Sequence, residues 1–171
     1  MKTEGIKDKK LHQVEKMQDK KIDNLDFILS KSEESLNEIF NFNVKAFADT
    51  QDFIWTIDNI KSEISSGWSP YSVKMGKEVV CVLFAKKDGA SLLTKNTPIK
   101  IDFQGQGVSH KIKDFYEELA DDHKVEEIRN YCPDDNFRMI GLNESHHYSR
   151  TGEVSGPNHN IIEWVKPWEA K

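Results

Sequence analysis

Cysteine and long apolar runs are scarce in this sequence, and each scarcity excludes a class of protein. Only two of the 171 residues are cysteine, Cys81 and Cys132, so the chain is no disulfide-stabilised scaffold and we expect both thiols to be free. No run reaches the roughly 20 apolar residues that a membrane helix needs. The lysine-rich start lacks the apolar segment of a secretory signal. We therefore expect a cytoplasmic protein that has no membrane partner.

Metal-ligand spacing is also missing. The six histidines are scattered, and His146 and His147 are adjacent, which suits neither one helix face nor the usual spacing of zinc ligands. We expect no metal site. The net charge of -5 argues against nucleic acid as a partner, because nucleic-acid binding requires a basic surface.

Charge is distributed unevenly along the chain. Residues 1–23 hold seven lysines against five acids, a net of +2, whereas residues 114–135 hold nine acids against Lys124 and Arg129, a net of -7. Two interpretations stay open. The charged segments are solvated faces, or the acidic one forms a rim that attracts a cationic substrate.

Hydrophobic content of 37%, with 10% aromatic residues, is enough for one folded domain. We place this domain at residues 24–171, after a charged helical arm at residues 1–23 in which Leu11, Val14 and Met17 recur at a spacing of three. The arm and the domain are the two units that we expect.

Strand and helix patterns alternate through the expected domain, which indicates an α/β or α+β fold with a mixed sheet. The pattern predicts strands over residues 25–29, 71–75, 78–85, 90–103, 125–132, 148–150 and 159–165. It predicts one helix after a Ser30-x-x-Glu33 capping box and a second from Asp49 or Thr50 to residue 64. Two more helices are predicted, one from the end of a 104–109 loop to about Asp121 and one after a cap at Asp134 or Asp135, with residues 152–158 as a loop.

A glycine-containing loop, Gln104-Gly105-Gln106-Gly107-Val108-Ser109, connects a long predicted strand to a helix. Gly105 and Gly107 permit a sharp turn and a close approach of the backbone to a ligand. The first N–H groups of the helix lack internal partners, which makes the helix start a site for phosphate. The alternative is that the glycines serve only a tight turn. The loop is neither a Walker motif nor a dinucleotide fingerprint.

This loop resembles the pyrophosphate loop of the GNAT superfamily, the acyl-CoA-dependent N-acyltransferases, which reads Gln/Arg-x-x-Gly-x-Gly/Ala. The preceding segment, with Ile99 and Phe103, is similar to the V-x-P-x-Y strand end of that family, with Ile101 in place of the proline. The resemblance implies a mostly antiparallel sheet, flanked by helices and splayed between its fourth and fifth strands. Pro98, which disfavours a central strand, lies where we expect this splay or a bulge.

A second segment supports the resemblance. Asn136 to Glu144 matches N-x-x-M-x-x-x-N-E, the pattern of one GNAT branch, and Ile112-Lys113 matches a Leu-Lys pair of the same branch. The order of elements agrees from residue 25 to residue 165. The resemblance implies an N-acetyltransferase that moves an acetyl group from acetyl-CoA to an amine, and edge strands that often pair subunits make a homodimer an expectation.

The resemblance also implies roles for residues around the cofactor. The backbone at Ile99 and Ile101 would pair with the pantetheine arm, and Asn136 would contact that arm. The N–H groups of residues 105–109, which include Gln106 and Val108, would hold the pyrophosphate, and the Ser109 hydroxyl would donate to it. Gln104 stands where many relatives have arginine, which removes one charge from the phosphate site.

The catalytic groups are less clear from the sequence. Asn143 stands where the family commonly has a tyrosine that protonates the leaving thiolate, and residues 92–97 lack the carboxylate that many relatives place there. Cys132 is either a thiol at the site or a small buried hydrophobe. His146 and His147 are either pocket residues, one of them a base, or a surface turn.

Two alternatives to the enzyme stay open. The missing tyrosine, the missing carboxylate and Gln104 are compatible with a non-catalytic acyl-CoA-binding module of the same fold, whose basic arm would contact a partner. The chain could also be an unrelated α/β domain whose glycine loop is purely structural.

Overall fold

The computed structural model describes residues 24–46 and 56–171, so the predicted arm at residues 1–23 lies outside the described residues. Seven strands form one sheet in the order β1-β2-β3-β4-β5-β7-β6, and every neighbouring pair is antiparallel except the parallel β4–β5 pair. The expected mixed and mostly antiparallel sheet is confirmed. The strands are β1 (Leu25–Leu29), β2 (Ser69–Met75), β3 (Glu78–Asp88), β4 (Ser91–Asn96), β5 (Glu127–Pro133), β6 (Ser149–Ser155) and β7 (Ile161–Pro167).

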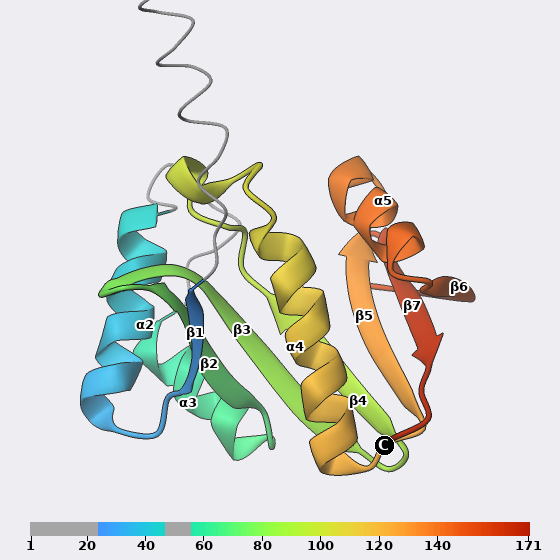
Figure 1. Ribbon diagram of the computed structural model, residues 1–171, viewed down its shortest axis with the longest axis horizontal. Coiled ribbons are helices and arrows are strands. Elements are labelled where there is room, and N and C mark those ends of the chain that lie inside the picture. The colour runs from blue at the N-terminus through green and yellow to red at the C-terminus, as the bar shows by residue number, and fades with distance from the viewer. Residues whose placement is uncertain (1–23, 47–55) are drawn as a thin grey trace, which may run out of the picture.

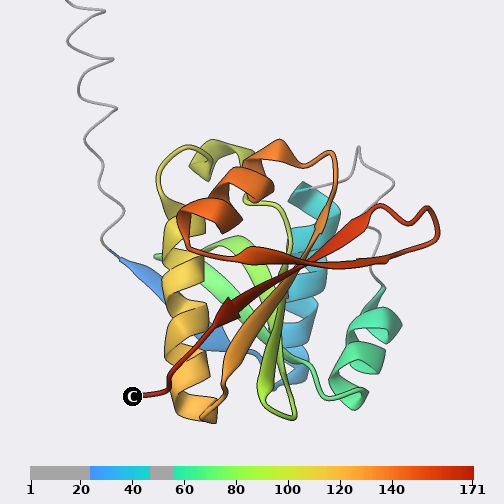
Figure 2. The same ribbon diagram turned by 90° about the vertical axis from the view of Figure 1, so that its right-hand side faces the viewer.

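Helices cover the two faces of the sheet unequally. Helices α2 (Glu33–Ala46) and α3 (Ile57–Ser65) lie on one face, over the β1–β4 half. Helix α4 (Val108–His123) lies on the opposite face, as Figure 2 shows, and α5 (Phe137–Ser145) stands at the end of β5. None of the described helices is long and apolar enough to cross a membrane.

Strand β3 is buried on both faces, as its continuous apolar run predicts. Successive side chains of a strand point to opposite faces, so Val82 and Phe84 pack under α2 and α3, while Leu83 packs under α4. Helix α4 meets the sheet with Ile112 and Tyr116, which recur at helical spacing and are almost fully buried. The core under α4 fixes this helix, and with it the loop that precedes α4, on the sheet.

The sheet opens between β4 and β5 (Figure 1). The two strands pair only from Ser91–Glu127 to Thr94–Asn130. Beyond that point β4 continues beside β3 as far as Asn96, whereas β5 follows β7 as far as Pro133. The expected splay between the fourth and fifth strands is therefore present, with the Thr94–Asn130 pair at its apex.

The predicted strand over residues 90–103 is wrong at its C-terminal end, because β4 stops at Asn96. The Thr97 N–H donates to the Val82 carbonyl and the Lys100 N–H to the Val80 carbonyl, so residues 97 to 100 oppose only residues 82 to 80. One extra residue on one side of a pair is a β-bulge, and it lies between Thr97 and Lys100, the stretch that contains Pro98, near which a bulge or a splay is expected. Ile101 to Phe103 form a 3-10 helix, η2 (Ile101–Phe103), instead of strand.

Helices α2 and α3 begin at other caps than the sequence predicts. Ser30 does not cap α2, because it is buried with its hydroxyl 3.2 Å from that of Ser72; Ser32 and Ser35 form the reciprocal cap instead. Thr56 caps α3 in a capping box with Asn59, so this helix does not begin at Asp49 or Thr50, which lie outside the described residues.

Two boundaries in the C-terminal third also differ from prediction. Asn136, and not Asp134 or Asp135, caps α5. The predicted loop at residues 152–158 is strand as far as Ser155, and β6 and β7 continue their pairing past an irregularity between Arg150 and Val154. Gly152 lies in that irregularity with a φ of 93°.

Candidate functional site

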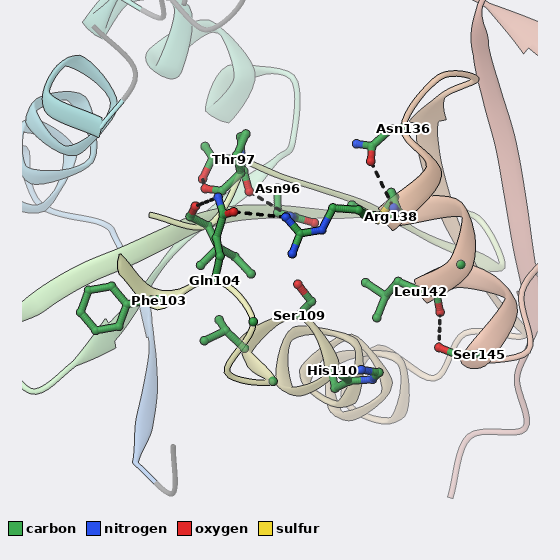
Figure 3. Close-up of a pocket in the computed structure, with 17 residues that line it drawn as sticks. Asn96, Thr97, Phe103, Gln104, Ser109, His110, Asn136, Arg138, Leu142 and Ser145 are labelled. Atoms are coloured by element: carbon green, nitrogen blue, oxygen red, sulfur yellow. Dashed lines mark hydrogen bonds between the residues drawn. The ribbon is translucent and has the colours of Figure 1, made fainter. Parts of the chain in front are cut away.

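A cavity of about 700 Å³ lies at the open end of the splay (Figure 3). Residues 96–99, 103–105 and 107–110, from the end of β4 to the first turn of α4, form one wall. Residues of α5 and its cap form the other wall, namely Asn136, Arg138, Met139, Gly141, Leu142 and Ser145. The cavity thus lies between the two halves of the sheet, and both predicted motifs line it.

Both loop glycines adopt backbone conformations that other residues rarely take. The φ angles are 74° at Gly105 and 87° at Gly107, and Gly107 is the N-cap residue of α4. A Cβ at either glycine would meet nothing within 4 Å, so conformation and not crowding requires glycine here. The N–H groups of the first α4 turn, beginning at Val108, have no partners within the helix. They lie at the cavity wall together with the Ser109 hydroxyl (Figure 3).

The Gln104 side chain forms two hydrogen bonds at the cavity wall. Its Nε2 donates to the Ile99 carbonyl at 2.8 Å, and its Oε1 accepts from Arg138 Nη1 at 3.2 Å. The second contact brings a guanidinium from α5 to the glycine loop (Figure 3). A positive charge therefore stands beside the loop although position 104 is neutral. Sequence reasoning missed Arg138, whose only signal was its place two residues after Asn136 in the second motif.

Seven of the ten predicted cofactor residues line the cavity, and three do not. The seven are Ile99, Gln104, Gly105, Gly107, Val108, Ser109 and Asn136. Ile101 is in η2 with 79% of its surface exposed, and its carbonyl accepts from the Gln104 N–H. The exposed Gln106 side chain donates to the Asp102 carbonyl. Asn143 is fully buried.

Asn136 has a structural task in addition to its place on the cavity wall. Its Oδ1 accepts from the Met139 N–H at 3.1 Å and so caps α5. The Nδ2 group is the part of the side chain that can donate to a ligand.

The other catalytic candidates, Cys132, His146 and His147, differ in burial and in protonation. Burial raises the pKa of the Cys132 thiol to about 11, and its Sγ donates to the Pro133 carbonyl, so the thiol is protonated near neutral pH. His146 lies at the C-terminal cap of α5 with its Nε2 2.8 Å from Nδ1 of His110, a cavity residue. Burial, then the neighbouring His110, lowers the pKa of His146. His147 is exposed with a φ of 65°, as in a surface turn.

The acidic segment at residues 114–135 falls mainly on α4, away from the cavity wall. Asp114, Glu118 and Asp122 are exposed on that helix. Asp121 accepts from the Trp168 indole and the Lys171 N–H, which ties the end of the chain to α4. These positions favour the solvated face over the substrate rim. Among the described residues there is no group of three or more His, Cys, Asp or Glu arranged to hold a metal ion.

The fold has many solved counterparts, although no protein-family model matches the sequence and no curated protein matches it. One is the ribosomal-protein-S18-alanine N-acetyltransferase from Escherichia coli, at a TM-score of 0.68 and 12% identity, covering 86% of this chain and 96% of that one. Another is the ribosomal L7/L12 α-N-protein acetyltransferase in complex with coenzyme A, at a TM-score of 0.68 and 14% identity, covering 87% of this chain and 97% of that one. A third is aminoglycoside acetyltransferase AAC(6')-Ib in complex with coenzyme A and kanamycin, at a TM-score of 0.67 and 16% identity, covering 84% of this chain and 95% of that one. Because these sequence identities are low, the comparison shows that the folds are similar and nothing further.

Proposed function

Because this chain has the fold of the GNAT acyltransferases, we propose that it is an N-acetyltransferase, which moves an acetyl group from acetyl-CoA directly to an amine. One observation carries the proposal. A cavity large enough for a nucleotide-bearing arm lies in the β4–β5 splay, and the N-terminus of α4 with its glycine loop forms one wall of that cavity.

The donor set of the cavity fits the phosphates of coenzyme A. The N–H groups of residues 105–109 supply donors at the positive end of α4, and the Ser109 hydroxyl adds another. The Arg138 guanidinium supplies the charge that Gln104 lacks. Acetyl-CoA bound there would supply an activated thioester. Ile99 and Asn136 line the same cavity, which is compatible with contacts from the Ile99 backbone and the Asn136 Nδ2 group to the pantetheine arm.

The proposed acceptor is an amine, on a small molecule or a protein. Attack requires the nitrogen to be unprotonated, so its proton must leave to water or to a base. Solved neighbours of the fold include proteins named for ribosomal-protein and aminoglycoside acceptors, and these span both classes. Either class is compatible with a cavity that is open at the surface.

A non-catalytic acyl-CoA-binding module is the second candidate. Asn143 favours it, because an amide cannot give up a proton, and because this side chain is fully buried where relatives commonly place a tyrosine. Turnover separates the candidates. The enzyme should release free thiol from acetyl-CoA with some amine or peptide of a broad panel, whereas the module should bind acetyl-CoA and release none.

Thermal unfolding in the presence of acetyl-CoA, with CoA as comparison, is the first test. At 100 times the dissociation constant, a ligand adds about 2.7 kcal/mol to the free energy of unfolding, so the midpoint should rise clearly. Gly107→Trp should abolish the rise. Gly89→Trp is the matched control, because Gly89 also has a positive φ and open space but lies in the β3–β4 turn. A Gly107→Trp protein that folds and keeps full affinity would show that the loop does not hold the cofactor.

A further inference from the structure

Two histidines form a hydrogen bond between the two halves of the split sheet. His110 lies in the first turn of α4 and lines the cavity (Figure 3), and His146 is the C-cap residue of α5. The Nδ1 atom of His110 lies 2.8 Å from the Nε2 atom of His146, and the two ring centres are 5.1 Å apart. Because α4 packs on one half of the sheet and α5 follows β5 of the other half, this contact joins the two halves beside the cavity.

Three side-chain hydrogen bonds between described residues join the glycine loop and α4 to α5 and its C-cap, and the histidine pair is one of them. The second lies near the start of α5, where Arg138 donates to Gln104 at 3.2 Å. The third is in the interior, where Lys113, only 2% exposed, donates through Nζ to Asn143 Oδ1 at 2.6 Å. The histidine pair joins α4 to the end of α5, and it alone consists of two side chains whose ordinary pKa lies near neutral pH.

A hydrogen bond between two imidazole rings depends on how many protons the pair carries. One of the two facing nitrogens must donate a proton, and the other must offer a lone pair. The pair meets this condition when both rings are neutral or when one ring is protonated. When both rings are protonated, each facing nitrogen carries a hydrogen and the rings repel each other as like charges. The contact that joins the two walls at neutral pH therefore becomes a repulsion in acid.

Most of the charged groups that face His146 oppose its protonation. Burial lowers the pKa of His146 below its ordinary value of 6.5. His110 and Lys113, both on α4, lower this pKa further, and so does Lys166 on β7, whereas Asp114 on α4 raises it. Because the pKa is lower in the folded protein than in the unfolded chain, the fold favours the neutral ring. The stability that this preference supplies is present above pH 6.5 and is lost as the pH falls below it.

We propose that His110 and His146 form a proton-operated clasp on the cavity. With at most one proton on the pair, the hydrogen bond holds the end of α5 against the first turn of α4. With a proton on each ring, the clasp releases and the two walls separate at this edge. Only four residue pairs join β4 to β5, so little else of the sheet resists this separation. Access to the cavity is thereby linked to pH, as in other switches that depend on paired histidines.

A double-mutant cycle on the free protein measures the clasp. Denaturant unfolding of wild type, His110→Ala, His146→Ala and the double variant gives the coupling free energy between the two side chains. This coupling should stabilise the fold at about pH 8, and it should vanish or become unfavourable by about pH 5. The matched control is the same cycle with Gln104→Ala and Arg138→Ala. That pair also joins the two walls, but neither side chain titrates in this range, so its coupling should be equal at both pH values.

Amide hydrogen exchange locates the opening in the fold. After correction for the pH dependence of the chemical exchange step, exchange in the first turn of α4 and the last turn of α5 should rise several-fold from about pH 8 to about pH 5, and exchange in α2 and α3 should change less. His146→Gln provides an acceptor for His110 that does not titrate. This variant should therefore keep exchange at both helix turns slow at both pH values.

Two results would overturn the inference. One is a coupling free energy between the histidines that is equal at both pH values or zero at both. The other is a rise in exchange that the His146→Gln protein shares with wild type, and this second comparison stands by itself should an alanine variant fail to fold. None of these measurements uses a ligand, so their failure leaves the proposed function intact, and a failure to bind acetyl-CoA leaves the clasp intact.

Discussion

At the scale of single residues, Lys113 gives the sharpest pH prediction. Burial lowers the pKa of Lys113 from its ordinary 10.5, the value in the unfolded chain, to about 7 in the folded protein, so unfolding takes up a proton between these pH values. Burial of the charged form costs stability in full below pH 7, and the cost disappears as pH rises toward 10.5. Relative to Lys113→Met, the wild type should therefore gain about 2 kcal/mol of unfolding free energy between pH 7 and about pH 9. Denaturant unfolding of both proteins at the two pH values measures this, with Lys77→Met, a change at an exposed lysine in the β2–β3 turn, as control. Equal pH dependence of the two proteins would mean that Lys113 titrates normally.

At the scale of elements, the cap of α5 separates a structural role from a binding role. Asn136→Ala removes both the cap and the Nδ2 donor, so we expect a loss of about 1 kcal/mol of stability together with weaker acetyl-CoA binding. Asn136→Asp keeps a cap oxygen and adds a favourable negative charge at the helix start, but it removes the donor. It should keep wild-type stability and still bind acetyl-CoA more weakly. Chemical unfolding and calorimetry on the same three proteins check this. An Asn136→Asp protein with unchanged affinity would reduce Asn136 to a cap alone.

The same scale shows what the sequence could predict. Periodicity was enough for β3 and α4, because each buries a regular set of side chains, and the glycine loop was evident because φ angles of 74° and 87° require glycine. The start of α2 was missed because a contact between distant residues selects the cap. The Ser30 hydroxyl lies beside that of Ser72, and Ser32 caps the helix instead. The Lys113–Asn143 and Arg138–Gln104 pairs were missed for a related reason. Each joins residues at least thirty positions apart, and no local spacing encodes such a pair.

At the scale of the whole molecule, the β4–β5 splay leaves the two halves of the sheet joined by a short parallel ladder of four residue pairs. The two cavity walls belong to different halves of the sheet. The glycine loop and the start of α4 belong to one half, and α5 belongs to the other. A ligand that contacts both walls must therefore couple them, and it stabilises the bound state against local opening. Acetyl-CoA should slow amide hydrogen exchange in the first turn of α4, in α5 and at the Thr94–Asn130 apex together. Exchange in α2 and α3, which pack on the other face of the sheet, should change little beyond any global stabilisation. Protection confined to residues 104–109 would show that the ligand sits on the loop alone and does not enter the splay, where transfer to an amine would have to take place.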